Sequence, residues 1–184
     1  MSDRYKGIYR GQTFRLKNWD YGSVGIYFVT ICTQNKEHYF GKIDNGEMQF
    51  SAIGHIVKDN WIEIQEQFPF VQLDEFVVMP NHIHGILIVE KSINKTSSID
   101  SNHLDSIYNT GGITGNKNPM FHNNISRIIR WYKGKCTFEI RKIDSLFKWQ
   151  TLFHDHIVRD EYSLKTIRKY IQENPSNWET DELI

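Results

Sequence analysis

The sequence predicts an α+β domain in which amphipathic helices pack on an antiparallel sheet. Three observations indicate this class: β-branched and aromatic runs recur, apolar residues at helical spacing separate them, and an Asn-Gly pair marks a tight hairpin. The order strand, hairpin, helix, strand, strand is typical of a sandwich with helices on one face of the sheet. We expect residues 1–184 to form a single domain.

The first elements are a strand, a hairpin and a helix. Residues 24–33 (VGIYFVTICT) have the composition of a buried strand. Asn45-Gly46 lies at the centre of the hairpin expected over residues 41–50. Apolar residues recur at helical spacing over residues 51–68, so we expect an amphipathic helix with Ser51 as its cap.

Two strands and a polar segment follow. Residues 73–79 and 82–90 are apolar and β-branched, and a Pro-Asn break separates them. Residues 91–121 are rich in Ser, Asn, Thr and Gly and have little apolar periodicity. A connection of this length is uncommon inside a compact domain, so we expect a flexible loop between two halves of one domain.

The last part of the chain predicts two helices around an extended segment. Residues 124–141 are basic, aromatic and helical in pattern, with a possible interruption at Gly134. Residues 147–158 are mixed and partly extended. Residues 160–173 form a helix that Asp160 caps and that ends at an Asn-Pro pair.

The composition is typical of a reduced intracellular protein. Two cysteines, Cys32 and Cys136, are too few for a disulfide framework or a zinc ribbon. The apolar runs are too short to span a bilayer, and the first residues lack the apolar stretch of a signal peptide. We expect a cytoplasmic protein with no membrane partner.

Zero net charge conceals a segregation of charge along the chain. Residues 36–105 carry five basic and eleven acidic residues, whereas residues 127–170 carry eleven basic and five acidic residues. A basic stretch can form a phosphate-binding face in a neutral protein. Solvated helix faces are the other interpretation.

The sharpest local feature is the run Met79-Pro-Asn-His-Ile-His84. Residues i and i+2 of a strand share a face, so His82 and His84 present two imidazoles side by side. Neutral imidazoles are good ligands for divalent metals. The alternative is a pair of polar residues on a solvated strand face. His154-Asp-His156 repeats the spacing, but we assign neither of these two histidines as a ligand.

Tyr170 and Asn174 form a second pair, four residues apart on one face of the last helix. The alternative is a tyrosine that packs in the core of an amphipathic helix with its hydroxyl satisfied.

Taken together, these residues resemble a known family. The His-hydrophobic-His motif resembles that of the HUH single-tyrosine transposases. Trp149-Gln150 with Phe153, Asp155, His156 and Arg159, then Tyr170-Ile171 and Asn174-Pro175, is similar to the REP-associated tyrosine transposases, as is the stretch from Trp131 to Gly134. In the insertion-sequence branch a glutamine usually follows the tyrosine at i+4; asparagine here favours the REP-associated branch. The resemblance runs from about Tyr27 to Trp178.

The resemblance implies a fold, an activity and a set of roles. The fold is a ferredoxin-like sandwich whose central antiparallel sheet carries the His pair. His82, His84 and Asn174 would bind a divalent cation, Mg²⁺ or Mn²⁺, although zinc is a further possibility. Tyr170 would attack a phosphodiester of single-stranded or hairpin DNA and form a 5′-phosphotyrosine link. Relatives act as monomers or as dimers, and the sequence leaves this open.

DNA contacts would come from the basic segment. Its cations could bind phosphates, and Trp131, Tyr132 or Trp149 could stack on bases, although core packing is the alternative for each aromatic. The cations that we assign to nucleic-acid binding are Arg127, Arg130, Lys133, Lys135 and Lys148.

Two functions therefore fit the sequence. The first is a transposase-like endonuclease and strand transferase that cleaves and rejoins single-stranded DNA. The second is a catalytically silent nucleic-acid-binding or regulatory protein derived from such an enzyme. The presence of all four site residues favours the enzyme.

Overall fold

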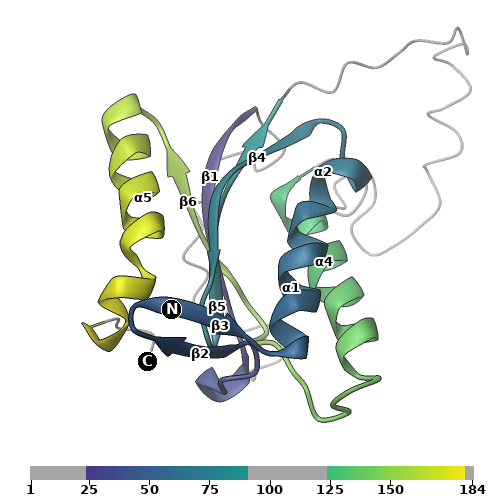
Figure 1. Ribbon diagram of the computed structural model, residues 1–184. Helices are drawn as coiled ribbons and strands as arrows, with labels where there is room; N and C mark the ends of the chain where they lie inside the picture. The colour runs from purple at the N-terminus through teal and green to yellow at the C-terminus, as the bar shows by residue number, and fades with distance from the viewer. Residues whose placement is uncertain (1–23, 91–123, 181–184) are drawn as a thin grey trace, which may run out of the picture.

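The computed structural model describes residues 24–90 and 124–180 (Figure 1). The elements before the first gap are β1 (Gly25–Cys32), η2 (Gln34–Lys36), β2 (Gly41–Asp44), β3 (Glu47–Phe50), α1 (Ala52–Ile62), α2 (Ile64–Gln67), β4 (Val71–Val78) and β5 (His82–Val89). The elements after it are α4 (Ile125–Ile140), β6 (His154–Val158), α5 (Glu161–Glu173) and η4 (Pro175–Thr180). The flexible loop expected over residues 91–121 lies outside the described residues.

The main sheet has the strand order β4-β5-β1-β6, and every neighbouring pair is antiparallel. With α1 and α4 as the connecting helices, this is the arrangement of a ferredoxin-like sandwich, and the β2–β3 hairpin is inserted between β1 and α1. The predicted α+β sandwich with a central antiparallel sheet is confirmed, and the strand that carries the His pair, β5, is central.

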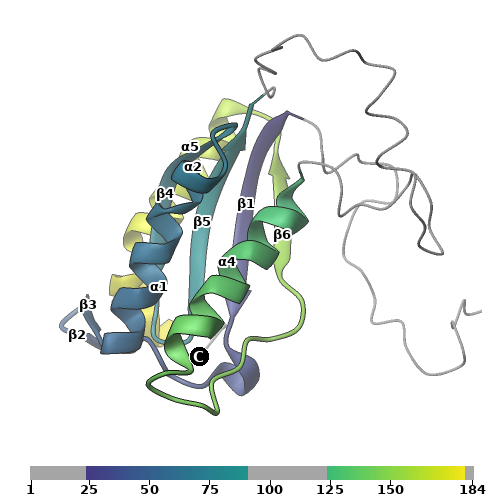
Figure 2. The same cartoon turned by 90° about the vertical axis from the view of Figure 1, so that its right-hand side faces the viewer.

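Helices cover both faces of the sheet, which differs from the arrangement on one face suggested by the element order (Figures 1 and 2). On one face, α1 and α4 pack on odd-numbered residues of β1 such as Tyr27 and Val29. On the other face, Leu164 and Ile171 of α5 pack against Ile86 and Val158. The central strands are apolar on both faces, so each face needs a cover.

Local sequence signals explain where the elements begin and turn. Ser51 accepts a hydrogen bond from the amide of Gly54 at the start of α1, and Asp160 accepts one from Ser163 at the start of α5. Asn45 has a positive φ, as a tight hairpin turn requires. The expected interruption at Gly134 is absent, because α4 runs unbroken from Ile125 to Ile140.

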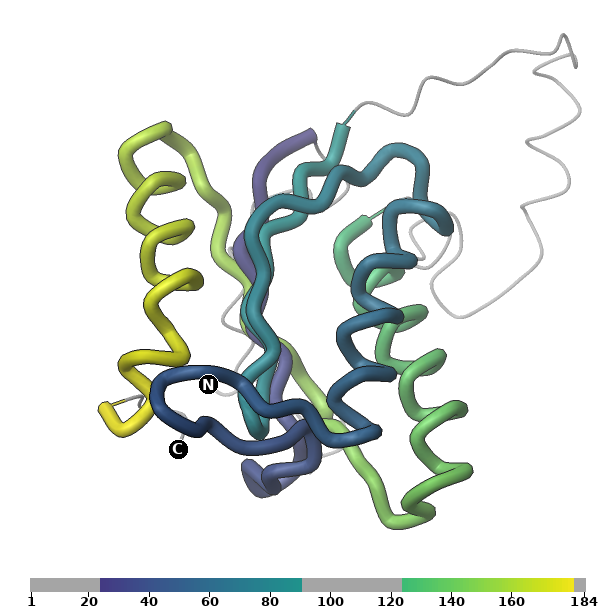
Figure 3. The backbone as a smooth tube through the Cα atoms, viewed as in Figure 1, coloured from purple at the N-terminus to yellow at the C-terminus, as the bar shows by residue number. Residues whose placement is uncertain are grey.

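The end of α5 lies beside the tip of the β2–β3 hairpin (Figure 3). A Cβ added at Gly46, in the hairpin turn, would lie 3.5 Å from the hydroxyl of Ser176 in η4. The inserted hairpin therefore flanks the end of α5 where Asn174 lies. Among the described residues, no helix has the length and apolarity needed to cross a bilayer.

Candidate functional site

The two histidines of β5 face α5. Their ring centroids are 4.5 Å apart, and the side chains are 0% and 3% exposed for His82 and His84, respectively. Ile83, between them, points into the core beneath α1 and α4. The strand alternation predicted from the sequence thus places both imidazoles on the same face.

Each imidazole is oriented through its Nδ1 atom. His82 Nδ1 lies 2.7 Å from Oδ1 of Asn81, and His84 Nδ1 lies 2.8 Å from Oγ1 of Thr30. The Asn81 oxygen can only accept, so His82 carries its proton on Nδ1 and its lone pair on Nε2. Burial, with a smaller contribution from Lys36, lowers the pKa of His82 to about 3. His82 is therefore neutral at pH 7, as a metal ligand must be.

Tyr170 reaches the His pair from α5. Its hydroxyl lies 3.1 Å from Nε2 of His84, and its ring meets Phe28 edge-on at a centroid distance of 6.2 Å. Tyr170 is 44% exposed, so the residue is open to solvent although it contacts His84. The alternative of a tyrosine buried in the core does not hold, and a single chain supplies both the phenol and the histidines.

Asn174 occupies the C-cap position of α5, one turn beyond Tyr170, and is 3% exposed. The helix then passes into η4, where Trp178 stacks on His82 with ring centroids 6.1 Å apart and an interplanar angle of 28°. The C-terminal end of α5 and η4 thus cover the His82 side of the site, while Tyr170 lies on the His84 side.

The sequence analysis missed the residues that hold the imidazoles. Thr30 faces His84 because β1 and β5 pair in that register, which no local pattern reveals. Asn81 directly precedes His82, and this position beside the His pair could have identified it as a supporting residue. Such hydrogen bonds to the second ring nitrogen fix the tautomer and orientation of ligating histidines.

The donor set fits a divalent cation. Two imidazoles with Nε2 directed away from their anchoring contacts, together with a buried amide, provide nitrogen and oxygen donors of the kind that Mn²⁺, Mg²⁺ and Zn²⁺ accept. Among the described residues, no group of three or more His, Cys, Asp or Glu side chains could hold a metal ion.

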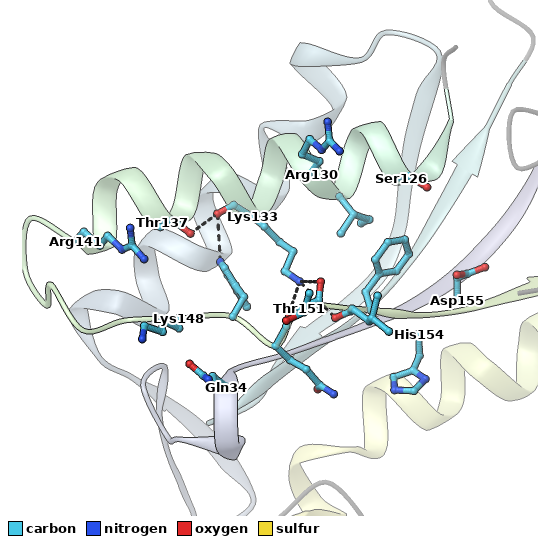
Figure 4. Close-up of a pocket in the computed structure, with 15 residues that line it drawn as sticks. Gln34, Ser126, Arg130, Lys133, Thr137, Arg141, Lys148, Thr151, His154 and Asp155 are labelled. Carbon is cyan, nitrogen blue, oxygen red and sulfur yellow. Dashed lines mark hydrogen bonds between the residues drawn. The ribbon is translucent and has the colours of Figure 1, made fainter. Parts of the chain in front are cut away.

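A basic groove of about 900 Å³ lies on the other face of the sheet, between α4 and the segment that leads into β6 (Figure 4). Its cations are Arg130, Lys133, Arg141 and Lys148. The groove extends to His154 on β6, the edge strand, and His154 pairs in register with Thr30. The edge formed by β6 therefore separates the groove from the face that carries Tyr170.

The five cations assigned to nucleic-acid binding lie in different surroundings. Arg130, Lys133 and Lys148 line the groove, and Arg127 is not among its lining residues. Lys135 instead forms a salt bridge with Glu63, which lies between α1 and α2. Arg141 was missed, although its spacing from Arg130 and Lys133 places it on the same side of α4.

Lys133 also has a structural role. Its ammonium donates to the carbonyl oxygens of Gln150, Thr151 and Leu152 at 2.5, 3.5 and 3.4 Å. Burial lowers its pKa to about 8. Lys133 therefore holds the segment before β6 against α4 and shapes the floor of the groove.

The candidate stacking aromatics pack in or against the core, and Trp149 also lines the groove. Tyr132 is fully buried and donates its hydroxyl hydrogen to the carbonyl of Val57, so core packing is its role. Trp149 donates its indole N–H to the carbonyl of Lys133 and packs against Phe40. Trp131 packs edge-on against Phe68.

Comparisons with known proteins support the fold and give a relative. No protein-family model matches the sequence. An uncharacterized protein from Haemophilus influenzae is 38% identical over 185 residues, which cover 100% of this chain and 98% of that protein.

Among solved structures, a REP-associated tyrosine transposase bound to a REP hairpin aligns with a TM-score of 0.56, 15% identity, and coverage of 91% of this chain and 74% of that one. A candidate transposase from Deinococcus radiodurans R1 aligns with 12% identity and a TM-score of 0.47, over 87% of this chain and 96% of that one. The fold of this chain is therefore transposase-like, and by its identity along the whole length the chain belongs to the same family as the Haemophilus influenzae protein.

Proposed function

We propose that this protein is a metal-dependent endonuclease and strand transferase that cuts single-stranded or hairpin DNA through a covalent link to Tyr170. The observation that carries the proposal is the 3.1 Å contact between the Tyr170 hydroxyl and His84 Nε2, which places a partly exposed phenol beside the two imidazoles. The fold is like that of a transposase bound to a REP hairpin, which supports DNA as the substrate.

The proposed reaction exchanges one phosphate ester for another. The phenolic oxygen of Tyr170 attacks phosphorus, the bond from phosphorus to the 3′-oxygen breaks, and a 5′-phosphotyrosine link forms. The 3′-oxygen leaves and takes up a proton, while the phenolic proton passes to water. Because the new link keeps the phosphodiester energy, attack by another 3′-hydroxyl reverses the step and joins strands.

His82, His84 and Asn174 would hold the cation. When bound, Mg²⁺ or Mn²⁺ would offset negative charge on the scissile phosphate. Asn81 would keep His82 in the tautomer whose Nε2 lone pair faces the site, and Thr30 would hold the orientation of the His84 ring. Because the Tyr170 hydroxyl lies 3.1 Å from His84 Nε2, the cation and the phenol would compete for this nitrogen.

The test is formation of an SDS-resistant protein–DNA adduct. Labelled single-stranded oligonucleotides from hairpins that flank the protein's own gene are incubated with the protein and Mn²⁺ or Mg²⁺. We expect an adduct that is lost when EDTA removes the metal. DNA binding without an adduct on an oligonucleotide that carries the bound sequence would contradict the enzyme and favour the silent DNA-binding descendant.

The basic groove is the proposed binding surface for the DNA backbone. We expect Arg130→Ala and Lys148→Ala each to weaken binding of single-stranded DNA and to lower the slope of log K against log salt by about one, because each contact releases a counterion. Lys58→Ala, on α1 away from the groove, is the matched control. Unchanged affinity and salt slope in both groove variants would place the DNA elsewhere.

A further inference from the structure

A bulge in β4 presents two consecutive carboxylates to α5. Leu73 pairs with Leu87 and Phe76 with Gly85, so β4 has one more residue than β5 across this interval. Asp74 and Glu75 are the residues within it. In a regular strand they would point to opposite faces, but both contact α5.

The contacts form a polar clamp between β4 and α5. Arg168 binds Asp74 in a bidentate manner, with Nε at 3.0 Å from Oδ1 and Nη2 at 2.5 Å from Oδ2. Gln172 donates from Nε2 to Oε1 of Glu75 at 3.0 Å. The hydrogen bond from Arg168 lowers the pKa of Asp74, so the carboxylate is ionised at neutral pH. We call these four residues the β4 clamp.

The clamp and the tyrosine lie on nearly opposite sides of α5. Arg168 and Gln172 are each two residues from Tyr170, which at 3.6 residues per turn is about 160° around the axis. Between the two sides lies the apolar stripe of Leu164, Ile167 and Ile171 that packs on the sheet. Hydrophobic contacts are not directional, so the apolar stripe by itself does not set the rotation of α5 about its own axis.

We propose that the β4 clamp sets the rotation of α5 about its axis and thereby places the Tyr170 hydroxyl at His84. Arg168 and Asp74 are positioning residues, because their contact with each other acts on Tyr170 through the helix. Side chains extend about 5–6 Å from a helix axis, so a roll of about 10° moves the end of Tyr170 by about 1 Å. A displacement of that size at a reacting atom can cost about 100-fold in rate.

The direct test measures the contact between Tyr170 and His84 without DNA or metal. In protein labelled with ¹⁵N-histidine, the Nε2 chemical shift of His84 reports its contact with the Tyr170 hydroxyl. The Tyr170→Phe variant gives the reference shift in the absence of this contact. We expect Arg168→Ala and Asp74→Ala to move this shift toward the Tyr170→Phe value. Lys165→Ala breaks an exposed i,i+4 pair on the same helix and should leave it unchanged.

The signals of the other histidines show whether a variant is still folded, so unfolding can be told apart from a displaced Tyr170. A variant with a smaller expected effect gives a second check. Gln172→Ala removes only the exposed half of the clamp and should give a smaller shift of His84 Nε2 in the same direction. A wild-type His84 signal in folded Arg168→Ala and Asp74→Ala proteins would overturn the proposal.

The kinetic consequence depends on the proposed function. At saturating oligonucleotide, Arg168→Ala should slow adduct formation about 10- to 100-fold with unchanged DNA affinity, and the Asp74→Ala/Arg168→Ala double variant should be no slower than either single variant. If the wild type forms no adduct, the proposed function is contradicted. The His84 chemical shifts still test whether the β4 clamp positions Tyr170. If both single variants form the adduct at the wild-type rate, the positioning role of the β4 clamp is contradicted and the proposed function stands.

Discussion

Replacing Tyr170 with phenylalanine is expected to abolish the covalent protein–DNA adduct while leaving DNA affinity within about twofold. The substitution removes the nucleophilic oxygen and keeps the ring that meets Phe28, so the fold and the groove should persist. The measurement is adduct formation on denaturing gels beside a binding titration. Tyr162→Phe is the matched control, because Tyr162 is 82% exposed on the same helix. A residual adduct of wild-type yield would contradict the assignment.

The same variant should bind Mn²⁺ more tightly. In the structure the Tyr170 hydroxyl lies 3.1 Å from His84 Nε2, so a cation that binds this nitrogen has to displace the phenol. A neutral hydrogen bond contributes about 0.5–1.5 kcal/mol, so its removal should raise metal affinity about two- to tenfold. Titration calorimetry measures this without DNA, and weaker binding would show that Tyr170 supports the cation rather than competing with it.

Gly85→Ala is expected to lower the free energy of unfolding by about 2–3 kcal/mol. Gly85 follows His84 and faces α1, where an added Cβ would lie 2.2 Å from Cζ2 of Trp61. Trp61 is fully buried and packs against Phe76 and Tyr132, so its ring cannot withdraw without disturbing the core. Urea unfolding followed by tryptophan fluorescence gives the free energy.

Gly134→Ala provides a control of opposite sign. A Cβ at this position meets nothing within 4 Å, and Gly134 lies in the middle of α4. Alanine there should stabilise the protein by about 0.5–1 kcal/mol, because it has a higher helix propensity and restricts the unfolded chain more. Equal effects at the two glycines would contradict the close contact between β5 and Trp61.

The part of the site that follows from local periodicity could be predicted from the sequence. Strand alternation places His82 and His84 on one face, and a spacing of four places Tyr170 and Asn174 along one side of a helix. The contact between these two pairs depends on where α5 packs. That position is set by tertiary contacts, because the central strands are apolar on both faces and no local pattern chooses between them.

The supporting residues could not be predicted for a related reason. Thr30 meets His84 through the register of β1 and β5, and Asp74 meets Arg168 through a bulge that inserts one residue into β4. Each arises from pairing between segments far apart in the sequence. In α4, by contrast, helical geometry alone separates Lys135, which faces Glu63, from Arg130 and Arg141 in the groove.

The most direct measurement locates the covalent link. The adduct formed with Mn²⁺ is digested with nuclease and protease, and tandem mass spectrometry identifies the residue that carries the nucleotide phosphate. We predict a 5′-phosphoryl link on Tyr170 and none on Tyr162. A link on another residue would contradict Tyr170 as the nucleophile, and a Tyr170-linked nucleotide that forms equally well in EDTA would contradict the role of the cation.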